Sequence, residues 1–170
     1  MATILPFRDY DEKDVINLFA FSGTLPATKG TLVKIQAGFK ATDEISMLGN
    51  VGQSYPNTVS ERYGVAAQVA VAGTGDSALG MLLFDVRETD ENGELLKFNP
   101  RKAAEMGAVI SGQAVPIVTR GIFRYSGAAG TPTAGGTAYN GANGVISATG
   151  TQVVGKFLGA ADADGFVTVK

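Results

Sequence analysis

Residues 112–127 read Gly-Gln-Ala-Val-Pro-Ile-Val-Thr-Arg-Gly-Ile-Phe-Arg-Tyr-Ser-Gly, a segment with glycine at both ends. Its alternation of apolar and polar residues predicts a β-strand of roughly ten residues. The face that we expect to point into a core carries Val115, Ile117, Thr119, Gly121, Phe123 and Tyr125. The opposite face carries Pro116, Val118, Arg120, Ile122 and Arg124. A long strand with one aromatic-rich face needs other strands to cover it.

Arg120 and Arg124 restrict where the second face of this strand lies. Burying a bare charge costs several kcal/mol or more, so both guanidinium groups must meet water, a carboxylate or another subunit. One of these three alternatives is another subunit, so Arg120 and Arg124 are candidate subunit-interface residues. Pro116 lacks an N–H group, which places its end of the segment at a strand start or a sheet edge.

The composition excludes several classes of chemistry. The chain has 170 residues, which favours a single domain, and it contains neither cysteine nor histidine. Disulfides, zinc ligation by thiolate or imidazole, and Ser-His-Asp triads are therefore excluded. We expect a protein that is not an enzyme and that carries no cofactor and no metal. The net charge of −2 also gives no basic patch for nucleic acid, so DNA and RNA are not expected partners.

The sequence also bears on membranes and location. No apolar run reaches the roughly 18 residues that a membrane span needs. Arg8 and Asp9 interrupt the N-terminal apolar residues before a signal peptide can develop. We expect no membrane partner and synthesis in the cytoplasm.

Residues 1–22 are predicted to form an N-terminal arm that leads into the domain. Pro6 favours an extended backbone here. The apolar residues that we predict to bind a partner are Ile4, Leu5, Phe7 and Tyr10. An extended segment can add as a strand to the edge of a partner's sheet, so we expect the arm to be disordered in the free protein. The alternative is an ordinary frayed terminus.

Several further strands are predicted along the chain. Residues 11–21 allow either a helix or a strand, because periodicity alone does not decide. Residues 31–39 alternate as a half-buried strand does. The apolar segments 63–72 and 77–86 are predicted to pair as a hairpin across Gly73–Asp76. A last pair, 153–159 and 166–169, is separated by a turn at Asp162–Gly165.

Residues 87–107 differ from their surroundings because they are rich in charge, and we predict a surface excursion here. It holds the clearest helix signal in the chain, with Asn99 as N-cap, Pro100 at the first helical position and Gly107 as the stop. A short helix is expected near residues 100–106. Residues 126–144 hold many glycines and are predicted to form a long surface loop.

These elements together predict an all-β fold with minor α content. We expect a small β-barrel or β-tulip-like domain over residues 23–170, with an extended N-terminal arm and one short helix. Closure of the sheet would avoid free edges.

Two short motifs are candidates for ligand sites. Residues 73–78, Gly-Thr-Gly-Asp-Ser-Ala, match a dinucleotide fingerprint. The next residues form an apolar run without the pattern of an amphipathic helix, so a hairpin loop is favoured. Asp162 and Asp164 are spaced as in the start of a calcium loop, but the remaining ligands are missing. We interpret both motifs as turns.

Three segments of the C-terminal part resemble the capsid decoration, or cement, proteins of tailed phages. They are residues 112–125, the segment Val-Gly-Lys-Phe-Leu-Gly-Ala at 154–160, and Asp-Gly-Phe-Val-Thr-Val-Lys at 164–170. Near the N-terminus, residues 14–20 are similar to the start of some members. The order and spacing of the segments carry the resemblance, since strands with glycine turns are common. The excursion at 87–107 is absent from the smallest proteins of this kind.

The resemblance implies a β-barrel or β-tulip protein that forms a homotrimer on the outer surface of the virion. There it would bind the major capsid protein and stabilise the expanded head. An alternative from another class is a carbohydrate-binding or other adhesion β-module on a virion surface. Such modules usually expose aromatic residues, and this chain has no Trp and five Tyr. A hydrolase is a third possibility, which the lack of His and Cys disfavours.

Overall fold

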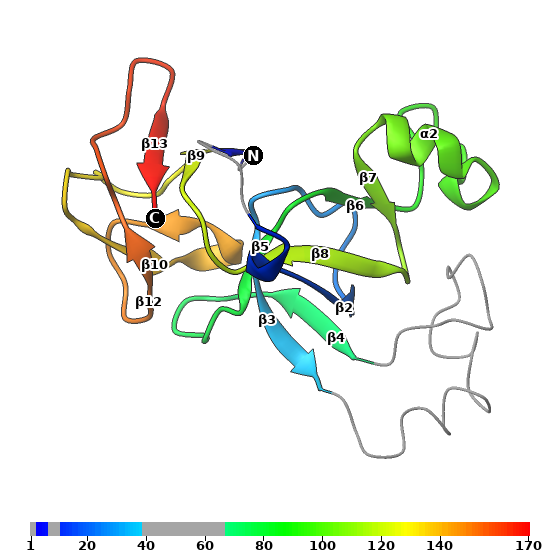
Figure 1. The fold of residues 1–170 in the computed structure, drawn as a ribbon, viewed down its shortest axis with the longest axis horizontal. Helices are drawn as coiled ribbons and strands as arrows, with labels where there is room; N and C mark the ends of the chain where they lie inside the picture. Colours follow the sequence, from blue (N-terminus) through cyan, green and yellow to red (C-terminus); the bar gives the residue numbers. More distant parts are fainter. Residues whose placement is uncertain (1–2, 7–10, 39–66) are drawn as a thin grey trace.

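The computed structural model describes residues 3–6, 11–38 and 67–170. It is mostly β with one short α-helix, as the sequence predicted (Figure 1). The strands are β1 (Thr3–Pro6), β2 (Val15–Phe21), β3 (Leu32–Ala37), β4 (Gln68–Val71), β5 (Gly80–Leu82), β6 (Asp85–Arg87), β7 (Ala108–Ile110), β8 (Ala114–Val118), β9 (Phe123–Ser126), β10 (Thr137–Asn140), β11 (Ile146–Ser147), β12 (Val153–Lys156) and β13 (Phe166–Val169). The helix α2 covers Pro100–Glu105, and 3-10 turns lie at Glu12–Asp14, Leu96–Phe98 and Ala142–Gly144.

Five strands form a closed barrel in the order β2-β4-β3-β5-β8. Strand directions cannot alternate all the way round a closed ring of five, so one neighbouring pair must be parallel. That pair is β2 and β4, whereas the other four pairs are antiparallel. The barrel confirms the predicted fold class, and β2 settles residues 15–21 as a strand. The barrel core is formed by Phe19, Phe21, Ala27, Val33, Ala67, Val69, Leu82, Val86, Val115 and Ile117.

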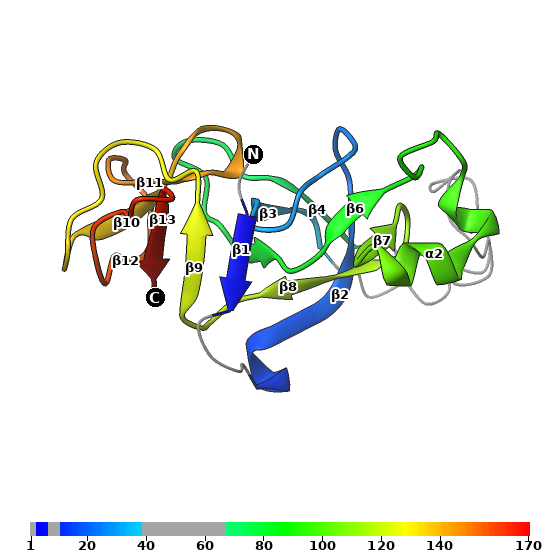
Figure 2. The same cartoon turned by 90° about the horizontal axis from the view of Figure 1, so that it is seen from above.

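Two three-stranded sheets, β1-β9-β13 and β11-β10-β12, lie beside the barrel. Isolated bridges join Phe157 to Val169 and Ala129 to Ser147, so the two sheets wrap around a shared core. We call them the C-terminal sheets. Figures 1 and 2 place β10, β12 and β13 at one end of the long axis and α2 at the other. The second core contains Ile4, Leu32, Ala72, Met81, Val118, Phe123, Tyr125, Ala138, Ile146, Phe157, Val167 and Val169.

Strands β3, β5 and β8 lie between the two cores, although β3 extends beyond them at Ile35 and Gln36, which are exposed. Successive residues on each strand alternate between the cores, as in the pairs Leu32 and Val33, Met81 and Leu82, and Ile117 and Val118. The prediction that Val118 lies on the wet face is wrong. Its side chain is buried against the C-terminal sheets.

The predicted long strand over residues 112–127 is two strands, β8 and β9, which belong to different sheets. Gly121 lies between them with φ +148°, a conformation that residues with a Cβ rarely adopt. A Cβ on Gly121 would also lie 2.5 Å from the ring of Phe123. The chain therefore leaves the barrel at this glycine and enters the second core.

Two predicted pairings need correction. The apolar segments around β4 and β5 do not form a hairpin, since β3 lies between them and pairs with both. The residues that begin the first segment, 63–66, lie outside the described part of the chain. In the last predicted pair, Phe157 does bridge Val169. The main partners are different, however, because β12 pairs with β10 and β13 pairs with β9.

The glycine-rich segment 126–144 is not only a surface loop. It contains β10, in which Ala138 and Asn140 are fully buried. The Asn140 side-chain amide donates hydrogen bonds to the carbonyls of Gly73 at 2.7 Å and Asp76 at 3.0 Å. This contact fixes the Gly73–Asp76 loop against the C-terminal sheets, and residues 73–76 are a loop as the sequence predicted.

The charged excursion is a folded lobe, which we call the charged lobe (residues 87–107). Its helix α2 confirms the prediction, since the Asn99 side chain accepts a hydrogen bond from the Lys102 N–H and Gly107 has φ +62°. Below the helix lies a small core of Leu96, Ala103 and Ile110. The parallel pair β6 and β7 attaches the lobe to the barrel.

Candidate functional site

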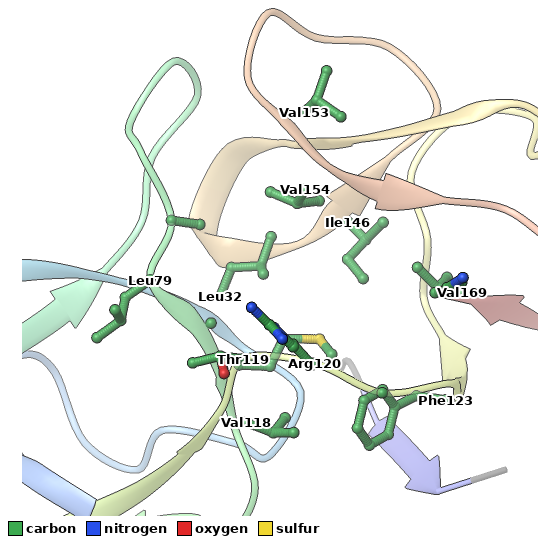
Figure 3. Close-up of a pocket in the computed structure, with 15 residues that line it drawn as sticks. Leu32, Leu79, Val118, Thr119, Arg120, Phe123, Ile146, Val153, Val154 and Val169 are labelled. Carbon is green, nitrogen blue, oxygen red and sulfur yellow. The ribbon is translucent and has the colours of Figure 1, made fainter. Parts of the chain in front are cut away.

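A pocket of about 200 Å³ lies where the barrel meets the C-terminal sheets (Figure 3). We call it the junction pocket. Barrel residues Leu32, Met81 and Val118 form part of its wall, and the C-terminal sheets contribute a further part. The residues from that side are Phe123, Ile146, Val153, Val154, Val169 and Lys170. The pocket therefore exists only when both parts of the fold are assembled.

The charge of the junction pocket is one-sided. Among the described residues, Arg120 and Lys170 are its charged lining residues, and no carboxylate side chain from that part of the chain lines it. Figure 3 shows the Arg120 side chain in the middle of the pocket. Arg120 is exposed, and within residues 3–6, 11–38 and 67–170 it forms no hydrogen bond or ion pair. The pocket thus combines apolar walls with a guanidinium that is available to an acidic group.

The backbone around Arg120 is fixed on both sides. The preceding residue, Thr119, donates from its N–H to the Asp14 carbonyl at 2.8 Å, and its hydroxyl donates to the same oxygen at 3.1 Å. The following residue, Gly121, makes the turn from β8 into β9. A Cβ on Gly80 would collide with the carbonyl of Val118, so glycine lets β5 approach β8 closely below the pocket. Arg120 is therefore presented by a rigid support.

Arg124, the second predicted interface residue, has its partner within the chain. Its guanidinium lies 2.6 Å from the Asp162 carboxylate and stacks 4.7 Å from the centre of the Phe166 ring. The argument that Arg124 needs another subunit therefore no longer holds. The structure separates the two arginines, since only Arg120 lines the pocket.

Asp162 is a turn residue, as the sequence predicted. One of its carboxylate oxygens accepts hydrogen bonds from the Asp164 N–H at 3.1 Å and the Phe166 N–H at 2.8 Å. The Phe166 bond, together with the Arg124 guanidinium, lowers the pKa of the Asp162 carboxyl. Within the described part of the chain, no group of three or more Asp, Glu, His or Cys side chains could hold a metal ion.

The four predicted capsid-binding residues of the arm have different positions: one is buried, one is exposed, and two lie outside the described residues. Residues 3–6 form β1, which pairs with β9, so this part of the arm is an ordered strand of the domain. Ile4 is only 3% exposed and belongs to the second core, so its prediction as a partner-binding residue is wrong. Leu5 points outward at 40% exposure. Phe7 and Tyr10 lie outside the described residues.

Next to β1 lies a second hollow, which we call the β1 groove. Its volume is about 260 Å³, and Leu5, Pro6, Phe84 and Met106 are among the residues that line it. Within the described residues β1 is the last strand of its sheet. An outward-facing apolar strip therefore accompanies a sheet edge.

Sequence reasoning identified Arg120 but missed the apolar wall around it. Val153 and Val154 are neighbours on β12, and both line the pocket. Two adjacent apolar residues on a strand indicate that both faces of the strand contact something apolar. That signal was present in the sequence, yet it could not reveal which other segments complete the wall.

No helix in the described part of the chain is long and apolar enough to cross a membrane. No family model, no curated protein and no solved structure matches the chain.

Proposed function

We propose that this protein is a structural virion protein that binds the outer surface of a phage head as a homotrimer and cements neighbouring major capsid subunits. The observation that carries the proposal is that the segments resembling cement proteins fold as neighbours. Residues 123–125 lie on β9, which pairs with β13 at Phe166–Val169, and Phe157 bridges Val169. The last residues of the first segment therefore lie beside the other two segments, whereas its residues 114–118 form β8 of the barrel.

The β1 groove is the surface that best suits the capsid protein. Leu5 and Phe84 line this groove, and their exposed fractions are 40% and 41%. An extended apolar segment of a capsid subunit can lie along a sheet edge, with main-chain hydrogen bonds for affinity and side chains in the groove for specificity. Leu5 keeps its predicted role in this scheme, whereas Ile4 supports the groove from below.

Trimerisation would strengthen such a contact. A single groove of this size gives modest affinity, but three linked copies bind with a high effective concentration. A ligand that binds the expanded lattice and no other form stabilises that form by mass action. A small β-protein can therefore cement a head without any catalytic step.

The test is decoration of undecorated expanded heads assembled from the major capsid protein of the same phage. We expect wild-type protein to bind at saturating, countable copies per head. Leu5→Asp should weaken binding at least tenfold, a loss of about 1.4 kcal/mol, because it places a charge in the groove. Leu18→Asp is the matched control, since Leu18 is exposed on β2 and does not line the groove. If wild-type protein does not bind the heads, the proposal is refuted.

The carbohydrate-binding alternative has weaker support. Among the described residues, Phe123 is the one aromatic residue that lines the junction pocket, and it is buried. Sugar rings usually stack on exposed aromatic faces, which this pocket does not offer.

A further inference from the structure

The charged lobe ends in an unusually exposed aromatic residue. Phe98 is 78% exposed, more than any other large apolar side chain among the described residues, and Leu95 nearby is 40% exposed. The Glu91 and Glu94 side chains, also exposed, lie in the same segment. The lobe thus presents an apolar tip (Leu95 and Phe98) bordered by carboxylates.

The tip is held by a rigid base. Leu96, between the two tip residues, is buried against Ala103 and Ile110. Below it the buried Asp90 carboxylate is paired with the Lys102 ammonium, and it also accepts N–H hydrogen bonds from Asn92 and Glu94, both at 2.8 Å. The exposure of Phe98 is therefore built into a folded element. Aromatic side chains are enriched at protein–protein interfaces, so Phe98 is a candidate contact residue.

The net charge of the tip is negative once internal pairs are accounted for. Lys102 is paired with Asp90, and Arg101 lies 3.1 Å from Glu105. Lys97 stacks over the Phe98 ring at 5.2 Å. Glu94 is 73% exposed and only 4.0 Å from Lys102, and Glu91 is exposed beside it. The carboxylates at the rim therefore outnumber the remaining cation.

The junction pocket complements this tip in shape and charge. Most of its lining side chains are apolar, and among the described residues the charged ones are Arg120 and Lys170, with no carboxylate side chain. At about 200 Å³ it is smaller than the roughly 300–1,000 Å³ of small-molecule sites. A cavity of this size suits one or two side chains.

The tip and the pocket of one molecule do not meet. The lobe lies at one end of the long axis, and the β12 and β13 residues of the pocket wall lie toward the other end (Figures 1 and 2). Their complementarity can therefore be used only between two molecules. The occupant that the structure itself supplies, with the right charge and an exposed aromatic group, is a second copy of this chain.

We propose that Phe98 of one copy inserts into the junction pocket of the next, with Glu94 pairing with Arg120. We call this contact the tip–pocket joint. It is heterologous, since two different surfaces meet, and such contacts form closed rings when the rotation allows. The joint rests on the self-association part of the proposed function and gives the charged lobe a role. It does not depend on capsid binding.

A complementation experiment tests the joint with two variants on exposed residues. Phe98→Ala removes the aromatic residue of the tip, and Arg120→Glu replaces one of the two cations of the pocket with a carboxylate. By sedimentation velocity over a concentration series, we expect wild-type protein to assemble and each variant to self-associate at least tenfold more weakly. An equimolar mixture of the two variants should form heterodimers and nothing larger, because together they supply one intact tip and one intact pocket. Leu18→Ala, an exposed apolar change elsewhere, should assemble like wild type.

Charge exchange provides a second readout. The double variant Glu94→Arg/Arg120→Glu should recover assembly that Arg120→Glu alone loses. Wild-type protein that stays monomeric at every concentration would overturn the joint, and so would single variants that assemble normally or a mixture that does not pair. Melting curves of each variant establish that it is folded.

The two proposals can fail separately. If wild type and both variants decorate heads in the same trimeric arrangement, the joint is wrong while the cement function stands. If the complementation succeeds but no form binds heads, the joint stands while the capsid proposal falls.

Discussion

Tyr125 makes a polar contact inside the otherwise apolar second core. Its side chain is fully buried, and its hydroxyl oxygen accepts a hydrogen bond from the Ile146 N–H at 3.1 Å, which ties β9 to β11. Burial raises the pKa of the Tyr125 hydroxyl, so the group stays neutral. One oxygen atom thus satisfies a backbone donor that has no access to water.

Tyr125→Phe should destabilise the protein by about 1–3 kcal/mol, because it leaves the Ile146 N–H buried without an acceptor. Tyr139→Phe is the control. Tyr139 is half-buried on β10, and its loss of a hydroxyl should stay within about 0.5 kcal/mol. Urea unfolding of both variants measures the difference. Equal stabilities for the two would mean that the hydrogen bond contributes nothing measurable.

Arg120 and Arg124 show how much of a single residue's environment the sequence pattern can predict. Period-two alternation indicated that both guanidinium groups lie outside an apolar core, and both are exposed to solvent. It could not distinguish them, because Asp162 reaches Arg124 across 38 positions of sequence. A partner at that distance is set by the pairing of β9 with β13. The alternation of apolar and polar residues along 112–127 does not predict that pairing.

At the scale of elements, β1 is an integral strand of the fold. Ile4 packs in the second core next to Gly30, where a Cβ would lie 2.7 Å from the Ile4 side chain. The sequence predicted an arm that could be removed without loss of stability. Since β1 pairs with β9 over four residue pairs, that expectation no longer holds for residues 3–6.

Ile4→Ala should therefore cost about 2–5 kcal/mol as a truncation of a buried side chain. Leu5→Ala, one residue along the same strand, should change stability by no more than about 0.5 kcal/mol. Thermal and urea unfolding of the pair compare the two faces of β1 directly. If Ile4→Ala unfolds at the wild-type midpoint, β1 does not contribute to the folded domain in solution.

Local signals in the sequence predicted elements correctly, whereas the predicted pairings failed. The helix signal at Asn99, Pro100 and Gly107 depends on neighbours a few residues away, and α2 forms there. The hairpin across Gly73–Asp76 was wrong because β3 competes for both strands. The junction pocket could not be predicted for the same reason. Its wall joins Leu32, Val118 and Val154, which only the assembled topology brings together.

At the scale of the whole molecule, the two cores share a wall. Strands β3, β5 and β8 send alternate side chains into each core, so neither core keeps its full burial without the other. This explains why Val118 is buried. It also indicates that the barrel and the C-terminal sheets unfold as one cooperative unit.

Three carboxylates link separate parts of the molecule. Asp76 accepts hydrogen bonds from Lys34 and the Gly73 N–H, both at 2.7 Å, and these lower the pKa of its carboxyl, with Lys34 as the main cause. The Lys102 ammonium lowers the pKa of Asp90 in the charged lobe. Asp162 holds β9 to the last turn, and the Phe166 N–H and the Arg124 guanidinium lower its pKa.

The direction of these shifts predicts how stability depends on pH. A carboxyl whose pKa is lower in the folded than in the unfolded chain stabilises the fold above its ordinary value, here 3.8. That contribution is lost as pH falls through the lowered pKa values. The chain has no histidine and no cysteine, the side chains whose ordinary pKa values lie closest to neutrality. Stability should therefore be nearly constant between about pH 5.5 and 8 and fall steeply below about pH 4.

Urea unfolding from pH 8 to pH 2 measures this profile. The matched variant Asp76→Asn/Asp90→Asn/Asp162→Asn keeps the shape of each side chain but removes its negative charge. The paired cations Lys34, Lys102 and Arg124 then have no carboxylate partner at these positions. It should be less stable than wild type at pH 7 and show a shallower loss on acidification, so that the two curves converge near pH 2. Wild-type stability that stays constant down to pH 2.5, or a variant whose stability declines as steeply as that of wild type, would show that the loss of these ion pairs does not cause acid destabilisation. Because the three pairs lie in the Gly73–Asp76 loop, the charged lobe and the last turn, acid should weaken all three regions within the same pH interval.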